Sequence, residues 1–133
     1  MTHQLLARLS IISVLSIYTV PAHADDFAIN FGWEGIERCS STPPEIAVMN
    51  APEGTAHFLV KMVDLDFTAY NHGGGVAPNT SDGSISEADY IATNYRGPCP
   101  PGTTHTYEFT VEAQGADGGT LATATAKADF PPK

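Results

Sequence analysis

The chain has 133 residues and a formal net charge of −9, from 15 acidic and six basic side chains. A protein this acidic repels nucleic acid and anionic lipid surfaces, so the composition excludes a nucleic-acid partner held by overall charge. Any anion that the protein binds must be held by local hydrogen-bond donors, against the field of the whole molecule.

Residues 1–24 are typical of an export signal. After Arg8, the segment 9–20 is mostly apolar and uncharged, and "PAHA" places small residues just before Asp25. The alternative is a membrane anchor, but this run is shorter than the roughly 20 residues that span a bilayer. We therefore expect cleavage after residue 24, no stable membrane insertion, and a secreted or periplasmic protein.

The mature chain, residues 25–133, has 133 − 24 = 109 residues, which suits one domain. It keeps all 15 acidic residues and five of the six basic ones, so its formal charge is 5 − 15 = −10. No cofactor-binding motif is apparent in it.

After residue 24 the sequence shows almost no helical periodicity, and several segments show the patterns of β-strands. The segments 27–33 and 45–50 read as short strands, and Ala56–Asp64 is apolar on both faces, as in a central strand. Thr104–Ala113 alternates apolar and polar residues, and Thr120–Phe130 reads as a final strand rich in Thr and Ala.

Clusters of Gly and Pro separate these segments. The stretch Tyr70–Ser84, rich in Asn, Gly, Ser and Thr, shows no strand pattern, and we expect a long loop there. Short strands between turn signals predict an all-β fold: a single-domain antiparallel β-sandwich with little helix beyond the signal peptide.

Two cysteines, Cys39 and Cys99, make up the whole cysteine content. An even count in an exported chain predicts a disulfide, worth on the order of 4 kcal/mol for so long a loop. The alternative is two buried free thiols. Metal binding by the pair is less favoured, since neither belongs to a C-x-x-C unit.

The segment "AYNHGGG", residues 69–75, resembles the oxyanion hole of some esterases. Ester hydrolysis by that route needs a G-x-S-x-G nucleophile turn, which the chain lacks. We therefore predict a protein that is not an enzyme, and the alternative for the glycines is a flexible loop.

Several polar side chains cluster at predicted strand ends and loops. Asp64 and Asp66 are two residues apart and share a face if the strand continues, while His105 and Tyr107 share a face of another strand. Solvated carboxylates and core packing are the simpler interpretations. A less favoured one is a divalent metal site formed by Asp64, Asp66, His72 and His105.

A resemblance to a known family extends from Ser41 to Ala113. The segments "STPPEIAVMNAPEGTAHFLVKMVDLD", "HGGG" and "YRGPCPPGTTHTYEFTVEA" occur in the order found in the phosphatidylethanolamine-binding protein family, which includes the Raf kinase inhibitor proteins. "YRGPCPPGTTHTY" is the most specific match. The chain departs from the family pattern in "DLDFTAY", in Gly73 after His72 where the family has Trp, and in Thr106 in place of Arg.

The resemblance implies a β-sandwich with a pocket for an anionic group such as phosphate or a phospholipid headgroup. The pocket residues that it implies are Asp64, Asp66, His72, Gly97, Pro98, His105 and Tyr107. Backbone N–H groups around Gly97, the Tyr107 hydroxyl and a His105 ring N–H would donate to phosphate oxygens. The aspartate pair would accept an ammonium or hydroxyl from the same ligand.

These expectations define an exported, non-enzymatic protein that binds a small anionic or zwitterionic ligand. The alternative is a protein-interaction or inhibitor module that contacts a protease or surface partner through the loop Tyr70–Ser84.

Overall fold

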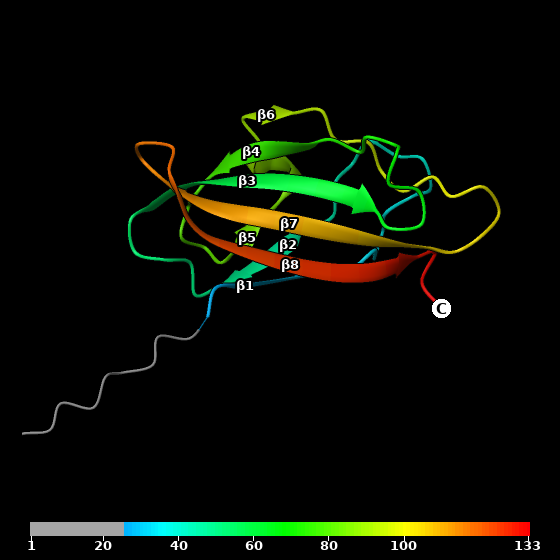
Figure 1. Ribbon diagram of the computed structural model, residues 1–133, viewed down its shortest axis with the longest axis horizontal. Helices are drawn as coiled ribbons and strands as arrows, with labels where there is room; N and C mark the ends of the chain where they lie inside the picture. The colour runs from blue at the N-terminus through cyan, green and yellow to red at the C-terminus, as the bar shows by residue number, and fades with distance from the viewer. Residues whose placement is uncertain (1–25) are drawn as a thin grey trace, which may run out of the picture.

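The computed structural model describes residues 26–133 as two packed antiparallel β-sheets (Figure 1). The smaller sheet has the order β1-β2-β5, formed by Ala28–Phe31, Ile46–Met49 and Ser84–Ile85. The larger sheet has the order β6-β4-β3-β7-β8, formed by Ala92–Thr93, Gly74–Pro78, Thr55–Asp64, His105–Gly115 and Thr120–Phe130. One short 3-10 turn, η1, covers Glu87–Asp89. The predicted antiparallel β-sandwich is confirmed.

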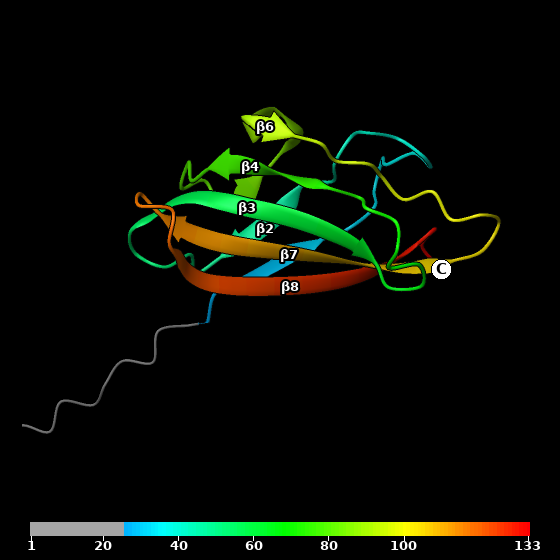
Figure 2. The same ribbon diagram turned by 45° about the horizontal axis from the view of Figure 1, so that its top comes forward.

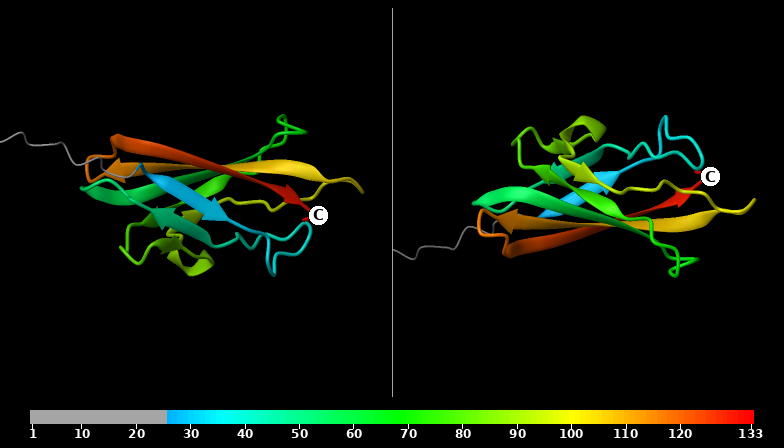
Figure 3. Two further views of the ribbon diagram at one scale, coloured as in Figure 1. Left: turned by 90° about the horizontal axis from the view of Figure 1, so that it is seen from below. Right: turned by 90° about the horizontal axis from the view of Figure 1, so that it is seen from above.

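The two sheets form two layers. Strands β3, β7 and β8 lie side by side in the larger sheet, with β1 and β2 behind them (Figure 2). Views from below and above show β1 and β2 crossing one face of this sheet and leaving its other face uncovered by strands (Figure 3). No helix within residues 26–133 has the length and apolar character needed to cross a membrane. The predicted signal peptide, residues 1–24, lies outside the described residues.

Strand β7 holds the larger sheet together because it pairs with β3 on one side and β8 on the other. Its residues alternate as the sequence predicts. The side chains of Tyr107, Phe109 and Val111 are fully buried, while Glu108 and Thr110 are only partly covered. The buried set faces the smaller sheet and forms the core.

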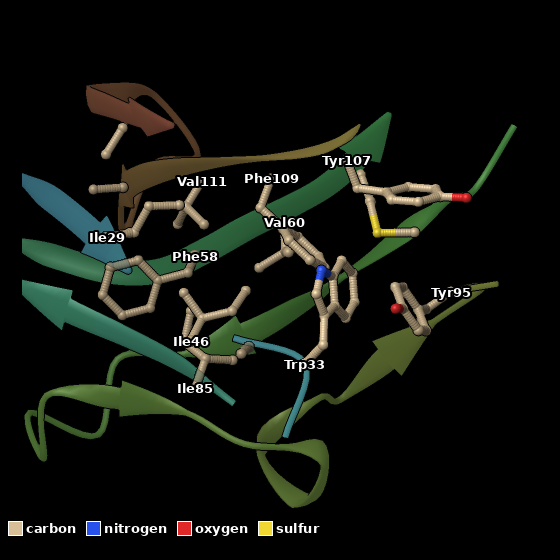
Figure 4. Close-up of a cluster of buried hydrophobic side chains, with 14 of the residues drawn as sticks. Ile29, Trp33, Ile46, Phe58, Val60, Ile85, Tyr95, Tyr107, Phe109 and Val111 are labelled. Atoms are coloured by element: carbon tan, nitrogen blue, oxygen red, sulfur yellow. The ribbon is translucent and has the colours of Figure 1, made fainter. Parts of the chain in front are cut away.

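Aromatic rings fill the core between the layers (Figure 4). The ring of Phe109 lies 4.7 Å from that of Phe31, edge to face, and 6.2 Å from each of the rings of Trp33 and Tyr95. Such contacts stabilise the core beyond the area that they bury. Trp33 belongs to the segment after β1, so this segment is anchored against β7.

The expected loop Tyr70–Ser84 is wrong in part, because β4 occupies Gly74–Pro78. Glycines provide no side-chain pattern by which a strand is recognised, and β4 forms through pairing with β3. Leu59 lies opposite Val76 and Lys61 lies opposite Gly74 in this pairing. Tertiary pairing here overrides the weak local preference of the sequence.

The glycines leave a groove of about 580 Å³ along β3, β4 and β6. Leu59, Val63 and Val76 are among the apolar side chains that line it. Gly74 has no space for a side chain, because a Cβ there would overlap the carbonyl oxygen of Val60. The "HGGG" motif therefore allows β3 and β4 to approach closely.

Replacing Gly74 by alanine is expected to lower the free energy of unfolding by about 1–3 kcal/mol, because the backbone of β3 must move to admit the methyl group. Urea unfolding measures the change. Gly32→Ala is the matched control, since the Cβ would meet only the Glu34 side chain, which can move away. Equal stability of the two variants would contradict the steric argument.

Candidate functional site

The predicted site residues meet where β3 ends and β7 begins. Asp64, the last residue of β3, lies opposite Tyr107 in the β3–β7 pairing, and His105 begins β7 two residues earlier. Residues two apart on a strand share a face, so His105 and Tyr107 lie together. Their rings are 6.4 Å apart and nearly parallel. The site is thus built on β3 and β7, the two paired strands of the larger sheet that lie farthest apart in the sequence.

Asp64 and His105 form a short, buried ion pair or hydrogen bond. The Asp64 Oδ2 atom lies 2.6 Å from His105 Nδ1, and the exposed fractions of the two side chains are 5% and 15%. The other carboxylate oxygen accepts the backbone N–H groups of Asp66 at 2.9 Å and Phe67 at 3.1 Å. Both oxygens of Asp64 are therefore fixed.

The pKa of Asp64 lies below its ordinary value of 3.8. Burial by itself raises this pKa, but the hydrogen bond and charge of His105, together with the two backbone N–H groups, outweigh the effect of burial. Asp64 is consequently an anion at neutral pH. Because a carboxylate is an acceptor, His105 carries a proton on Nδ1.

Replacing Asp64 by asparagine is expected to lower the free energy of unfolding at pH 7 by about 2 kcal/mol, since a charged buried hydrogen bond is lost. A lowered folded-state pKa gives stability that is complete above the unfolded value of 3.8 and is lost as pH falls through the folded value. The variant should therefore show a shallower loss of stability in acid.

Urea unfolding of both proteins from pH 7 down to pH 2 tests this expectation. Glu53→Gln, in an exposed turn, controls for the removal of one negative charge. An unchanged acid profile in Asp64→Asn would show that the His105 pair does not stabilise the fold.

His72 approaches the site from the segment before β4 and is buried, with 3% of its surface exposed. Its Nδ1 atom lies 2.7 Å from the carbonyl oxygen of Arg96, so that nitrogen must carry a proton. The ring packs edge-on against Tyr107 at 5.4 Å and in a tilted arrangement against Tyr70 at 4.6 Å. Tyr107 thus contacts both histidine rings.

The hydroxyl of Tyr107 is a buried polar group. The residue has no exposed surface, and its hydroxyl lies beside Asp64 and the backbone of Cys99. It makes no hydrogen bond of regular geometry within the described residues. Figure 4 shows the hydroxyl pointing away from the apolar core. Burial, followed by the negative charge of Asp64, raises the pKa of Tyr107, so the group keeps its proton and is a donor.

The segment after Tyr95, residues 96–100, forms a wall beside these residues. It is stiff because it contains Pro98 and Pro100, whose rings restrict the backbone and are fully buried. The wall contacts the β1–β2 connection. The Gly97 N–H donates to Ser40 and the Cys39 N–H donates to Pro98, each at 2.8 Å. Of the N–H groups around Gly97 that were expected to bind phosphate, that of Gly97 itself is not free, because it donates to the Ser40 carbonyl. A Cβ at Gly97 would also overlap the Ser40 carbonyl.

A disulfide joins the wall to the same connection. Cys39 and Cys99 are bonded, as the sequence predicts, with a sequence separation of 60 residues. Cys39 has a positive φ of 59°. The bond, together with the two backbone hydrogen bonds, fixes the wall against the smaller sheet.

A metal site is the less favoured use of these residues. Asp64, Asp66 and His105 each place a ligand atom within 4.8 Å of the others. The donors are already engaged, since Asp64 binds His105 and two N–H groups, and Asp66 Oδ2 accepts the Thr106 N–H at 2.7 Å. His72 is outside this group. The geometry favours hydrogen bonding over metal binding.

The structure brings together most of the predicted residues and adds others. Asp64 contacts His105, and Tyr107 lies against the rings of both His105 and His72, while Pro98 lies in the adjoining wall. Tyr70 and the Arg96 carbonyl were not predicted. An aromatic residue two positions before a candidate histidine is a weak signal for Tyr70, but a backbone carbonyl has no sequence signal at all.

Comparison with known proteins agrees with this fold. A profile described as phosphatidylethanolamine-binding protein matches residues 19–132. A search of curated proteins found no match. A crystal structure of a putative phosphatidylethanolamine-binding protein homolog from Chlamydia trachomatis aligns with a TM-score of 0.53 and 14% identity, over 80% of this chain and 98% of that one.

YbcL of E. coli, described as a new member of the mammalian family, aligns with the same TM-score at 19% identity, over 80% of this chain and 99% of that one. The two structures share the fold, and the profile covers most of the sequence. The chain belongs to the phosphatidylethanolamine-binding protein family.

Proposed function

We propose that the chain binds a small phosphate-bearing ligand, preferably a zwitterionic one, between His72, His105 and Tyr107. The buried hydroxyl of Tyr107, which makes no hydrogen bond of regular geometry within the described residues, carries this proposal. An unsatisfied buried donor costs about 1–3 kcal/mol of stability, so its retention is explained when a ligand oxygen accepts from it.

The surroundings of this hydroxyl suit a zwitterion better than a simple anion. The two histidines can donate to a phosphate through their second ring nitrogens when protonated. Asp66 is exposed and uses only Oδ2 in a backbone hydrogen bond, which leaves Oδ1 for an ammonium group. The family resemblance supports the same class of ligand.

NMR titration with inorganic phosphate and with phosphoethanolamine, following the ring signals of His72 and His105, tests the proposal. We expect both ligands to shift the two histidines, with tighter binding of phosphoethanolamine. Asp66→Asn should remove that preference while leaving phosphate binding intact. An absence of shifts at millimolar ligand would refute the site.

Tyr107→Phe distinguishes binding from structure. The variant removes a hydroxyl that makes no hydrogen bond of regular geometry within residues 26–133, so we expect the stability of the ligand-free protein to be unchanged or slightly higher. Phosphoethanolamine affinity should fall roughly ten- to a hundredfold, as for loss of a hydrogen bond to a charged group. Equal affinity in the two proteins would place the phosphate elsewhere.

A second candidate function, interaction with another protein, is favoured by one observation. Three large apolar side chains between β3 and His72 are exposed: Leu65, Phe67 and Tyr70, at 38%, 56% and 41%. We propose this segment, rather than the whole stretch Tyr70–Ser84, as the contact surface. Phe67→Ser should weaken capture of a protease or surface protein from an extracellular fraction without changing phosphate binding.

We also propose that the protein acts outside the cytoplasm. The disulfide supports this location, because such bonds persist in oxidising compartments, and the pattern of residues 1–24 supports it independently. Cell fractionation and N-terminal sequencing of the mature protein test it, with Asp25 as the expected first residue.

A further inference from the structure

The groove along β3, β4 and β6 lies on the face of the larger sheet that the smaller sheet does not cover. Because Val60 is buried toward the core, its neighbours Leu59 and Lys61 on β3 point to the opposite face. No strand crosses this face in the two views of Figure 3. The groove is therefore separate from His105 and Tyr107, neither of which lines it.

One end of the groove is apolar. Leu59 lies opposite Val76, and Val76 lies opposite Ala92, so the three side chains form a row across β3, β4 and β6. We call this row the apolar end. The volume of the groove, about 580 Å³, falls within the roughly 300–1,000 Å³ that is usual for small-molecule sites. The apolar end suits a hydrocarbon tail.

The next row along the strands is polar. Lys61 lies opposite Gly74, and Asn94 lies on the other side of Gly74, to which it is joined by two backbone-level hydrogen bonds of 3.0 Å. Because Gly74 has no side chain, no side chain of β4 separates Lys61 from Asn94. This row is two residues, or about 7 Å, from the apolar end.

The asparagines of the groove present donors to a ligand. Oδ1 of Asn71 accepts the Gly73 N–H at 2.9 Å, and Oδ1 of Asn94 accepts the Gly74 N–H at 3.0 Å. Only the oxygen of an amide accepts a hydrogen bond, so the NH₂ groups remain for a ligand. Lys61, Asn71 and Asn94 form what we call the donor end of the groove.

The charge of the groove is opposite to that of the whole molecule. Among the described residues that line it, Lys61 is the one charged side chain. Its ammonium nitrogen lies 3.9 Å from Glu112 Oε1, and the lysine side chain is 60% exposed, so the pair is loose. Glu112 also accepts the Thr120 hydroxyl at 3.0 Å. Lys61 is thus available to an anion in the groove.

We propose that the groove binds a medium-chain fatty acid, with its carboxylate at the donor end and its alkyl chain at the apolar end. A ligand with one negative group and one apolar part matches both ends. A hydrocarbon leaves the donors unused, an inorganic anion leaves the apolar end exposed, and a cation is repelled by Lys61. The site is independent of the proposed phosphate site, which lies at the junction of β3 and β7.

NMR titration of the backbone amides with octanoate tests the proposal. Octanol and octylammonium, which have the same alkyl chain, test recognition of the carboxylate. We expect octanoate to shift the amide signals of Gly74, Gly75 and Val76. It should bind at least about tenfold more tightly than the other two compounds, as for hydrogen bonds to a charged group. Salt should weaken its binding, because Lys61 is exposed.

Variants separate the two ends of the groove. Lys61→Met should lower octanoate affinity about tenfold and leave octanol affinity unchanged. Lys127→Met is the matched control, since Lys127 is an exposed lysine of the same sheet that lies outside the groove and pairs with Glu108 at 3.4 Å. Ala92→Trp should fill the apolar end and abolish binding of octanoate and octanol, whereas Thr123→Trp, exposed on β8, should not.

Four results would overturn the inference. Saturable shifts are absent with octanoate, or all three compounds bind with equal affinity, which would mean that the carboxylate is not recognised. The shifts centre on His72 and His105, which would place octanoate at the proposed phosphate site. Lys61→Met and Lys127→Met have equal effects, which would mean that octanoate responds to the charge of the sheet and not to the groove.

Discussion

Replacing Phe109 by alanine is expected to lower the free energy of unfolding by about 3–5 kcal/mol, the largest single-site effect on the fold. Phe109 has no exposed surface and contacts the aromatic rings of Phe31, Trp33 and Tyr95. Removal of the ring leaves a cavity between the two sheets, which their paired backbones cannot close.

Urea unfolding at neutral pH measures this change, and Leu121→Ala is the control. Leu121 is a large apolar residue on β8, but 48% of its surface is exposed, so its truncation should cost about 0.5 kcal/mol or less. Similar losses in the two variants would mean that Phe109 is not central to the core.

The second large effect concerns the disulfide. Replacing both Cys39 and Cys99 by serine is expected to destabilise the fold by about 4 kcal/mol, since the bond closes a loop with a sequence separation of 60 residues. The variant should also bind phosphoethanolamine more weakly, because the wall at Gly97 and Pro98 is then held by two backbone hydrogen bonds alone.

Unfolding of the oxidised protein with and without reductant gives the same comparison without mutation. Counting free thiols in unfolded, unreduced protein shows directly whether the bond has formed. A reductant-insensitive transition, or two reactive thiols, would contradict the expectation.

The sequence predicts the long strands because their side chains alternate or stay apolar over many residues. β8 begins and ends where expected, and β3 and β7 agree to within two residues at each end. β4 could not be found, since Gly74 and Gly75 present no side chains from which a period could be read. Its formation depends on the partner strand β3, which lies elsewhere in the chain.

The site, like the fold, contains features that the sequence predicts and features that depend on distant parts of the chain. His105 and Tyr107 could be placed on one face because the alternation of β7 is visible in the sequence, whereas only the family resemblance grouped them with Asp64. The occupied Gly97 N–H could not be predicted, since it depends on the approach of Ser40 from the β1–β2 connection. The roles of backbone groups are decided by packing, which a single sequence does not display.

The site assembles only through contacts between distant parts of the chain. The Asp64–His105 bond joins residues 41 positions apart, and the His72–Arg96 bond joins residues 24 apart. No short fragment can therefore reproduce the proposed pocket, and an unfolded chain has no affinity for the proposed ligand through it. Any compound that occupies the pocket must raise the melting temperature of the whole domain, by an amount that grows with its concentration relative to its Kd. A thermal-shift screen of phosphate esters consequently searches for the natural ligand without knowledge of its identity, and Tyr107→Phe marks which shifts arise from this pocket.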